Sequence, residues 1–438
     1  MIKLAVKKIL KVSAIVLLLF LMSFLLQLNF NIALFLLSLC LYLKARHPNL
    51  NKKNYNLLHL SLLFLIIFVA SYFLIKKGWP LLFIPFSVIP MLATILFLRL
   101  EISLVLIFAS SLAISAVAGN NFDLAVLFII SGIASTLLVR RINKRDDIFR
   151  AGILIGLIQA VIFFFIQQFK ITNWVDVVIL LSNGIACSII VLGILPVFEH
   201  LFSTITNLSL SELLNHPLME RMKLEASGTH LHCLVVGNLS EAACNAIGAN
   251  GLLARVGAYF HDIGKLAKPQ YFSENQSEEE SKHDVLSPSM SKIIIMNHVK
   301  EGVELAKKNR LTPVLIDFIQ QHHGNSLVYY FYRRALETLE KDEEVKEEVF
   351  RYPGPKPDTK ETAVVLLADS VEAATRSLTN PAPAQIEEVV HKIINNKFIE
   401  GLLDECDLTL RDLEKISAVF IRILSGIHYN RVAYPEKP

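Results

Sequence analysis

The chain has 438 residues, of which 53% are hydrophobic and only 19% are charged, and its mean hydropathy is +0.49. Soluble domains carry about a quarter charged residues, so this composition excludes a disordered chain and argues against a wholly soluble one. The charge is unevenly divided, because residues 1–200 hold 17 Lys and Arg against 6 Asp and Glu, whereas residues 201–438 hold 26 against 33. An apolar, basic half is therefore followed by an acidic half of ordinary composition.

Apolar runs follow one another through the first half of the chain. A transmembrane helix needs about 20 mainly apolar residues, and most of these runs approach that length. They lie at about residues 12–28, 30–43, 57–75, 81–98, 102–118, 122–139, 151–169 and 174–198. Residues 12–43 form either one long helix or a hairpin, so the sequence predicts seven or eight transmembrane helices over residues 1–200. The first run is expected to be an uncleaved anchor, because no clear small-residue cleavage site follows it.

Basic loops set the expected orientation of this transmembrane bundle. The segment Arg140–Arg145 is the strongest of them, and the positive-inside rule places it in the cytoplasm. Alternation of the spans then places Lys44–Asn56 and the chain after Pro196 on the same side. Lys76 and Lys77 fall outside, in mild conflict with the rule. The second half of the chain is therefore predicted to be cytoplasmic.

Ionisable residues within the spans would indicate transport, because transporters bury such groups near the membrane midplane. Here Glu101, Asp123 and Asp176 all stand at the ends of predicted spans. The distribution favours an anchoring or sensing role over transport.

After Pro196 the hydrophobic spacing becomes that of amphipathic helices, and alternating strand patterns are scarce. Residues 201–228 are expected to form a juxtamembrane helical linker with a helix over Leu210–Leu224, and residues 229–438 a separate all-α domain. Further helices are predicted at about 231–247, 251–261, 287–299, 300–309, 313–322, 326–348, 360–378, 383–397 and 409–427. The fold class is therefore all-α, a multi-span bundle followed by a helical cytoplasmic domain.

Seven His and Asp residues of the second half stand on or beside predicted helices. They are His232, His261, Asp262, His298, His322, His323 and Asp369. Imidazole nitrogen and carboxylate oxygen suit iron, manganese and zinc, and Asp262 could bridge two cations with its two oxygens. His232, His261 and Asp369 would then complete the first metal site. His298, His322 and His323 would complete the second.

Longer motifs surround these residues. They are Gly228–His232, Val236–Leu239, Ala249–Lys265, Gln321–Gly324, Tyr329–Tyr332, Phe350–Pro357 and Leu367–Ala373. Together they resemble the HD superfamily of metal-dependent phosphohydrolases, and more closely the seven-transmembrane receptor HD-hydrolase family with its PgpH-type cyclic-di-AMP phosphodiesterases. The resemblance is strong over about residues 205–430 and extends to the multi-span region in architecture. It implies that the seven residues hold two divalent metal ions, iron or manganese.

The resemblance also implies a reaction and a location. The enzyme would lie in the inner membrane of a bacterium, with its HD domain in the cytoplasm, and open cyclic-di-AMP to the linear dinucleotide pApA. A hydroxide formed from a water that bridges the two metals would attack phosphorus in line with the leaving 3′ oxygen. Lys265 is expected to neutralise the phosphate oxygens, and Arg351, Tyr352 and Lys356 to line the dinucleotide cleft with it.

The chain departs from the family pattern at two places. The family usually has Tyr-His-His-Ser where this chain has His230-Leu231-His232-Cys233, so His232 is the expected ligand and His230 a neighbour. The family also commonly carries a large extracellular domain after its first span, and only Gln27–Asn31 stands at that place here.

Two alternatives remain open beside cyclic-di-AMP hydrolysis. One is an HD phosphohydrolase acting on cyclic-di-GMP or another nucleotide, and the other is a non-catalytic cyclic-dinucleotide receptor. The cyclic-di-GMP enzymes of the superfamily carry Gly-Tyr-Pro where this chain has Arg351-Tyr352-Pro353, which favours adenine by resemblance only. The expected partners are the dinucleotide and membrane lipid, with a homo-oligomer left open. Long nucleic acids are disfavoured, because the acidic second half lacks a broad basic surface.

Overall fold

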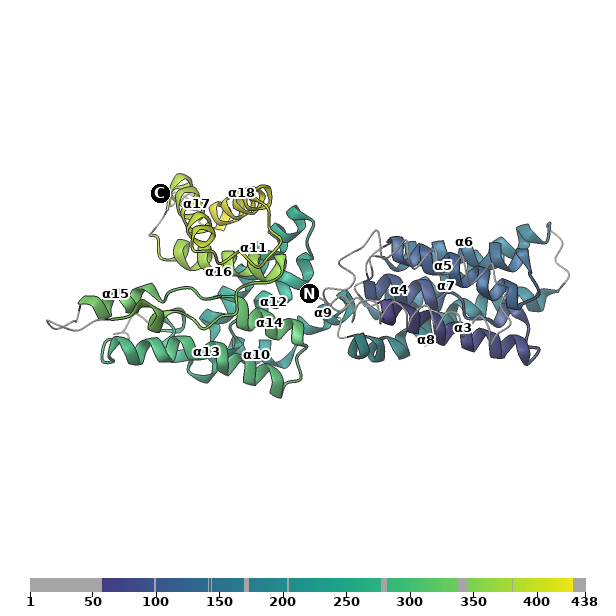
Figure 1. The fold of residues 1–438 in the computed structure, drawn as a ribbon, viewed down its shortest axis with the longest axis horizontal. Coiled ribbons are helices and arrows are strands. Elements are labelled where there is room, and N and C mark those ends of the chain that lie inside the picture. The colour runs from purple at the N-terminus through teal and green to yellow at the C-terminus, as the bar shows by residue number, and fades with distance from the viewer. Residues whose placement is uncertain are drawn as a thin grey trace, which may run out of the picture. The chain divides into compact units, whose positions relative to one another are not determined.

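The computed structural model describes residues 57–97, 100–140, 142, 144–168, 173–202, 205–276, 282–337, 345–379 and 381–427. Within these ranges the chain is helical and contains no strand, apart from one isolated antiparallel bridge between Leu327 and Arg351. Its contacts divide it into two compact units, residues 1–208 and 209–438 (Figure 1). The all-α architecture predicted from the sequence is confirmed.

The first unit consists of helices that are apolar on all sides. In chain order they are α3 (Leu57–Lys76), η2 (Leu81–Phe83), α4 (Val88–Phe97), α5 (Leu100–Val117), α6 (Phe122–Val139), α7 (Arg145–Ile166) and α8 (Trp174–Phe202). Four of the described helices are long and apolar enough to cross a membrane, over residues 100–117, 122–139, 145–166 and 174–201. The predicted runs 12–28 and 30–43 lie outside the described residues, so the total number of spans stays a prediction.

The span predicted as one helix over residues 81–98 is interrupted, and that prediction is wrong. Pro85 lies between η2 and α4, and a proline removes a backbone donor and disrupts a continuous helix. The side-chain amide of Asn183 in α8 donates to the carbonyl oxygens of Leu82 and Ile84, at 3.0 and 3.1 Å. Irregular backbone in an apolar environment needs partners of this kind.

Helices α7 and α8 cross at glycines. Gly152 and Gly156 stand one turn apart in α7 and face Gly184 in α8. A Cβ atom on Gly184 would collide with the carbonyl oxygen of Gly152 and the backbone nitrogen of Gly156. Small residues at this spacing let two membrane helices approach closely.

The second unit is a helical domain built around α16. Its elements, with α9 beginning just before the boundary, are α9 (Asn207–Leu213), α10 (Pro217–Glu225), α11 (Ser227–Ile247), α12 (Gly251–Phe260), η3 (Ile263–Ala267), η4 (Pro269–Tyr271), η5 (Ser273–Asn275), α13 (Pro288–Lys308), α14 (Pro313–Gln321), α15 (Tyr329–Glu337), η6 (Glu347–Phe350), α16 (Lys360–Arg376), α17 (Pro383–Ile399) and α18 (Leu410–Ile427). Residues 363–368 of α16 are fully or almost fully buried, and α16 contacts α11, α12, α14, α17 and α18. The helix carrying Asp369 is therefore the centre of this core.

Four predicted helices of this unit have different limits in the structure. Pro217 begins α10, so the helix predicted over Leu210–Leu224 is two helices. The two helices predicted over 287–299 and 300–309 are one, α13, because no proline interrupts this stretch after Pro288 at its first turn. The helix predicted over 326–348 begins at Tyr329 and its described part ends at Glu337. Phe350, in η6, packs against Phe331 and Ala335 of α15.

Candidate metal centre

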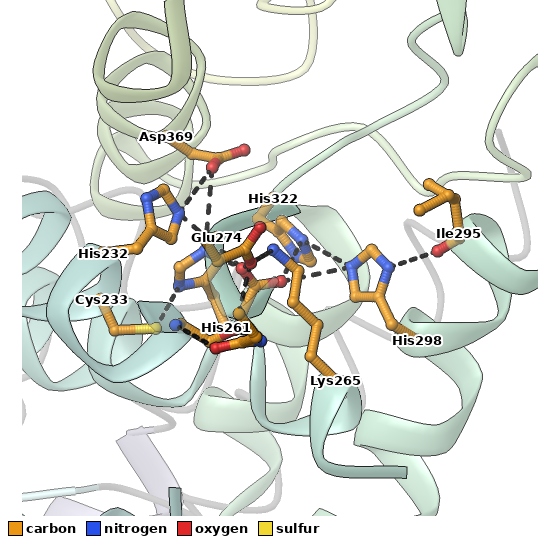
Figure 2. Close-up of polar contacts among 12 residues, drawn as sticks. His232, Cys233, His261, Lys265, Glu274, Ile295, His298, His322 and Asp369 are labelled. Atoms are coloured by element: carbon orange, nitrogen blue, oxygen red, sulfur yellow. Dashed lines mark hydrogen bonds and ion pairs between the residues drawn. The ribbon is translucent and has the colours of Figure 1, made fainter. Parts of the chain in front are cut away.

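The structure brings all seven predicted metal ligands together from five helices. His232 comes from α11, His298 from α13 and Asp369 from α16. His261 and Asp262 follow the last residue of α12, and His322 and His323 follow α14. Figure 2 shows the labelled histidines pointing toward one another below Asp369. The ligand atoms of His232, His261 and Asp369 lie within 4.8 Å of one another, and so do those of His298, His322 and His323.

Gly264, within the His-Asp-Ile-Gly-Lys motif, permits the approach of α13 to this centre. A Cβ atom on Gly264 would overlap the backbone carbonyl of His298 and crowd the backbone nitrogen of Gly302. The glycine is therefore required by close backbone packing, which brings His298 beside Asp262.

Asp262 faces both groups of histidines with different oxygens. Its Oδ2 atom lies 3.2 Å from Nε2 of His261 and 3.7 Å from Nε2 of His232. Its Oδ1 atom lies 3.4 Å from Nε2 of His298 and 3.6 Å from Nε2 of His322. Burial alone would raise the pKa of Asp262, but His261 and Lys265 outweigh it and hold that pKa well below its usual range. The carboxylate is therefore ionised and placed between two sets of nitrogen atoms.

The histidines direct their Nε2 atoms inward because their Nδ1 atoms are engaged elsewhere. Nδ1 of His261, His298 and His322 lies 2.6, 2.5 and 2.9 Å from the backbone carbonyl oxygens of Ala258, Ile295 and Ile319, respectively. A carbonyl oxygen only accepts, so Nδ1 carries a proton in each of the three rings and Nε2 is the atom left to bind a metal ion. Backbone or carboxylate partners of this kind fix the tautomer of metal-binding histidines.

Two of these Nε2 atoms face each other. Nε2 of His298 and Nε2 of His322 are 3.2 Å apart, and both rings donate from Nδ1. Burial lowers the pKa of His322 to about 3 and also lowers that of His298, which favours neutral rings at neutral pH. Two acceptors at this distance repel each other unless a cation lies between or beside them. The donor set therefore fits a metal ion.

On the other side of Asp262, carboxylates surround the imidazole rings. Burial lowers the pKa of His232, but Asp369 and Glu372 outweigh that effect and raise the pKa to about 9. Nε2 of His261 and Oδ1 of Asp262 are buried and have no hydrogen-bond partner among the described residues. Protons and metal ions compete for such nitrogen atoms, so this half of the cluster also fits a divalent cation.

The four residues predicted to bind substrate have different environments. Lys265 lies 2.7 Å from both Oδ2 of Asp262 and Oε1 of Glu274. The ring of Tyr352 stacks on His323, with 4.2 Å between ring centroids. Arg351 bonds to Glu347 and to the carbonyl oxygen of Asn325, and Lys356 donates to the carbonyl oxygen of Gly401 at 2.8 Å. Lys265 and Tyr352 thus contact the predicted ligands directly, whereas the charged ends of the other two have local partners.

Two acidic residues of the centre were missed from the sequence. Glu372 stands one turn after Asp369 in α16, is 7% exposed, and hydrogen-bonds Nδ1 of His232. The Asp-x-x-Glu spacing within an apolar helix was the available signal, because it puts both acids on one face. Glu274 pairs with Lys265 from a Ser- and Glu-rich segment whose composition indicated only a solvated loop.

The fold and the site define a helical domain with an HD-type cluster, attached to a membrane bundle. Two family models match the chain, one in each of these parts. The model described as 7TM receptor with intracellular HD hydrolase matches residues 7–206, and the HD domain model matches residues 229–374. Both parts of the chain thus match the models expected of a seven-transmembrane HD hydrolase, and the predicted resemblance is confirmed. The chain is a membrane protein, and its HD domain implies divalent-metal binding.

Two of the similar proteins carry the name of the same activity. Over 427 residues the chain is 38% identical to the cyclic-di-AMP phosphodiesterase PgpH of Bacillus subtilis. This match covers 92% of this chain and 59% of the relative. It is 36% identical over 389 residues to PgpH of Listeria monocytogenes, with coverages of 87% and 53%. The crystal structure of the L. monocytogenes PgpH HD domain in complex with cyclic-di-AMP is 46% identical, covers 49% of this chain and 98% of that chain, and has a TM-score of 0.47. The chain spans somewhat over half the length of the two PgpH relatives.

Proposed function

We propose that this chain is a membrane-anchored, metal-dependent phosphodiesterase that hydrolyses cyclic-di-AMP to the linear dinucleotide pApA. The observation that carries the proposal is the geometry of Asp262, whose two oxygens face separate groups of inward-directed histidine nitrogens. A carboxylate so placed can join two cations, and paired cations suit the in-line displacement of a phosphodiester. The choice of cyclic-di-AMP is supported by the PgpH relatives.

The seven predicted ligands divide between two metal sites in this proposal. His232, His261 and Asp369 hold one ion, and Asp262 joins it to the other. The second is held by the remaining three histidines, His298, His322 and His323. Nitrogen and oxygen donors of this kind suit iron or manganese. When bound, the ions supply a water of lowered pKa and positive charge for the phosphate oxygens.

The protein's own residues orient this site. Lys265 uses two of its three N–H donors on Asp262 and Glu274, which fixes the bridging carboxylate and leaves one donor for a phosphate oxygen. Glu372 accepts the Nδ1 proton of His232 and keeps the Nε2 lone pair of that ring directed inward. Tyr352 stacks its ring on His323, which restricts the orientation of that imidazole.

The placement in the cell is part of the proposal. The basic segment Arg140–Arg145 favours a cytoplasmic loop, which puts the HD domain in the cytoplasm beneath the inner membrane of a bacterium. We divide the chain into a lipid-embedded transmembrane region of seven or eight helices over residues 1–200, a linker over 201–228 and the HD phosphohydrolase domain over 229–438. The acidic second half favours a small nucleotide held by metals over a long nucleic acid.

The test uses the full chain purified in detergent, depleted of metal and reloaded with Mn(II) or Fe(II). Cyclic-di-AMP and cyclic-di-GMP are followed separately by chromatography. We expect pApA from cyclic-di-AMP, and a loss of at least about a thousandfold in Asp262→Ala, because both metal sites lose their shared ligand. The exposed Glu388→Ala on α17 is the matched control and should retain wild-type turnover.

Other outcomes point to the alternatives. Preferred turnover of cyclic-di-GMP would replace the substrate while leaving the enzyme class intact. Binding of cyclic-di-AMP without turnover, with metal content verified, would reject the enzyme and favour a receptor that signals through the membrane helices.

A further inference from the structure

The ammonium group of one lysine near the predicted ligands has no hydrogen-bond or ion-pair partner among the described residues. Lys265, Arg351 and Lys356 each form hydrogen bonds to protein groups. Lys397 in α17 differs, because its ammonium group forms no ion pair or hydrogen bond with any residue that the structure describes. Nothing in the sequence singles it out among the lysines of the second unit.

The end of α17 lies against the loop that carries two predicted ligands. The backbone nitrogen of Leu402 donates to the carbonyl oxygen of Lys397 at 3.1 Å, and the Leu402 side chain packs against Gly324, directly after His323. Helix α17 also packs against α16, which carries Asp369. The charges of Asp369 and Arg351 both act on the Lys397 ammonium. Lys397 is therefore placed on the side of the centre formed by His323 and Asp369.

This is the side of the centre that solvent reaches. The side chains of His323 and Asp369 are 23% and 12% exposed. The other five predicted ligands are at most 2% exposed. A phosphate group approaching the metals must therefore pass the two exposed ligands, and it would meet Lys397 there.

An unpaired ammonium group is unfavourable in such a place. Burial lowers the pKa of Lys397, with Glu400 and Asp369 acting in the opposite direction. A charge that is partly removed from water costs free energy unless a counter-charge accompanies it. Glu400 and Asp369 offset the effect of burial only in part, and neither forms an ion pair with Lys397 in the described structure, so an anionic ligand would supply a directly paired counter-charge.

We propose that Lys397 is a substrate-binding residue that pairs with a phosphate of the dinucleotide at the open side of the metal centre. The proposal rests on the phosphodiesterase function proposed above and adds a residue to that site. In this proposal the two lysines have different roles. Lys265 orients Asp262 from inside the centre, whereas Lys397 receives the phosphate from outside.

The first experiment separates binding from turnover in the full, Mn(II)-loaded chain in detergent. Lys397→Gln removes the charge and Lys397→Arg keeps it, while Lys392→Gln alters an exposed lysine of the same helix. We expect the KM for cyclic-di-AMP to rise roughly ten- to hundredfold in Lys397→Gln, the range for a lost charged hydrogen bond. The value of kcat should change much less. Lys397→Arg should recover most of the affinity, and Lys392→Gln should match the wild type.

The second experiment does not depend on turnover. Inorganic phosphate is titrated calorimetrically into each Mn(II)-loaded variant, with bound metal measured in parallel. We expect phosphate affinity to fall about tenfold in Lys397→Gln with metal content unchanged. The ligand-free thermal stability of this variant should not be lower than that of the wild type, because an unpaired charge has been removed.

The outcomes keep the two proposals distinguishable. If the wild type hydrolyses neither dinucleotide, the proposed function is rejected and the phosphate titration alone decides the role of Lys397. Phosphate affinity and KM within twofold of the wild type in Lys397→Gln would overturn that role. An equal loss in Lys392→Gln would also overturn it, because the effect would then be one of general surface charge.

Discussion

The two units of the molecule bury polar groups in opposite ways. In the described part of the first unit, the buried polar side chains are all neutral Ser, Thr, Asn and Gln. Most of the hydroxyls bond to a carbonyl of their own helix, as Ser71 does to Ile67 and Ser135 to Ser131. In the second unit, the buried set includes His, Asp and Glu residues that face one another. Neutral groups can be satisfied locally, whereas the clustered ionisable groups are satisfied only together and with a cation.

Metal removal should produce the largest difference in hydrogen exchange between the two units. We expect chelation to increase hydrogen exchange in α12–α14, because the lone pairs of His298 and His322 then face each other at 3.2 Å without a cation. Helices α5–α8 contain no such cluster among their described residues and should exchange as before. A metal at a hundred times its dissociation constant stabilises by about 2.7 kcal/mol. Mass spectrometry of peptides from the full chain in detergent provides the measurement.

Asp262→Ala is the control for this experiment, since its exchange should no longer respond to the chelator. Equal exchange of α12–α14 with and without chelator in the wild type would contradict the idea that the centre depends on a cation.

A smaller effect is expected at Glu372, which contacts the cluster through its hydrogen bond to the imidazole of His232. Glu372→Gln keeps the size of the side chain but weakens its bond to Nδ1 of His232. Partners of this kind contribute roughly ten- to hundredfold to metal affinity, so Mn(II) affinity measured by competition with a chelating dye should fall within that range. Glu387→Gln, an exposed acid on α17, is the control. Unchanged affinity in Glu372→Gln would show that His232 is oriented without it.

The sequence predicted the metal cluster better than its surroundings. Histidine and aspartate on or beside apolar helices are informative because few other roles explain them together, and the structure brings all seven to one place. Glu372 and Lys397 lie on helices that were predicted, but residue type alone does not distinguish an inward acid or lysine from a surface one. Arg351 and Lys356 were predicted to bind substrate. Their residue type does not reveal that Arg351 already bonds to Glu347 and Lys356 to the carbonyl oxygen of Gly401.

The membrane unit shows a related limit. Hydropathy predicted an apolar segment over residues 81–98, and all residues of α4 are buried. It did not predict the interruption between η2 and α4, because hydropathy measures transfer from water and not backbone hydrogen bonding. Pro85 was the available signal, but the partner that makes the interruption tolerable is Asn183, about a hundred residues away in the sequence.

The smallest effect should come from a buried serine of the first unit. Ser135 donates to the carbonyl oxygen of Ser131 at 2.6 Å, four residues earlier in α6. Ser135→Ala removes this bond but leaves the carbonyl with its helical N–H partner, so the free energy of unfolding should change by no more than about 0.5 kcal/mol. Unfolding in mixed micelles, followed by circular dichroism, measures the change.

Asn183→Leu is the matched comparison within the same unit. It removes the donor to the carbonyl oxygens of Leu82 and Ile84. The Ile84 carbonyl still accepts from the backbone nitrogen of Phe86, whereas the Leu82 carbonyl has no other donor among the described hydrogen bonds. Leaving such an acceptor unsatisfied costs about 1–3 kcal/mol, so this variant should be clearly less stable than Ser135→Ala. Equal stability of the two variants would mean that neutral polar groups in this unit are interchangeable, and the contrast with the second unit would then rest on charge alone.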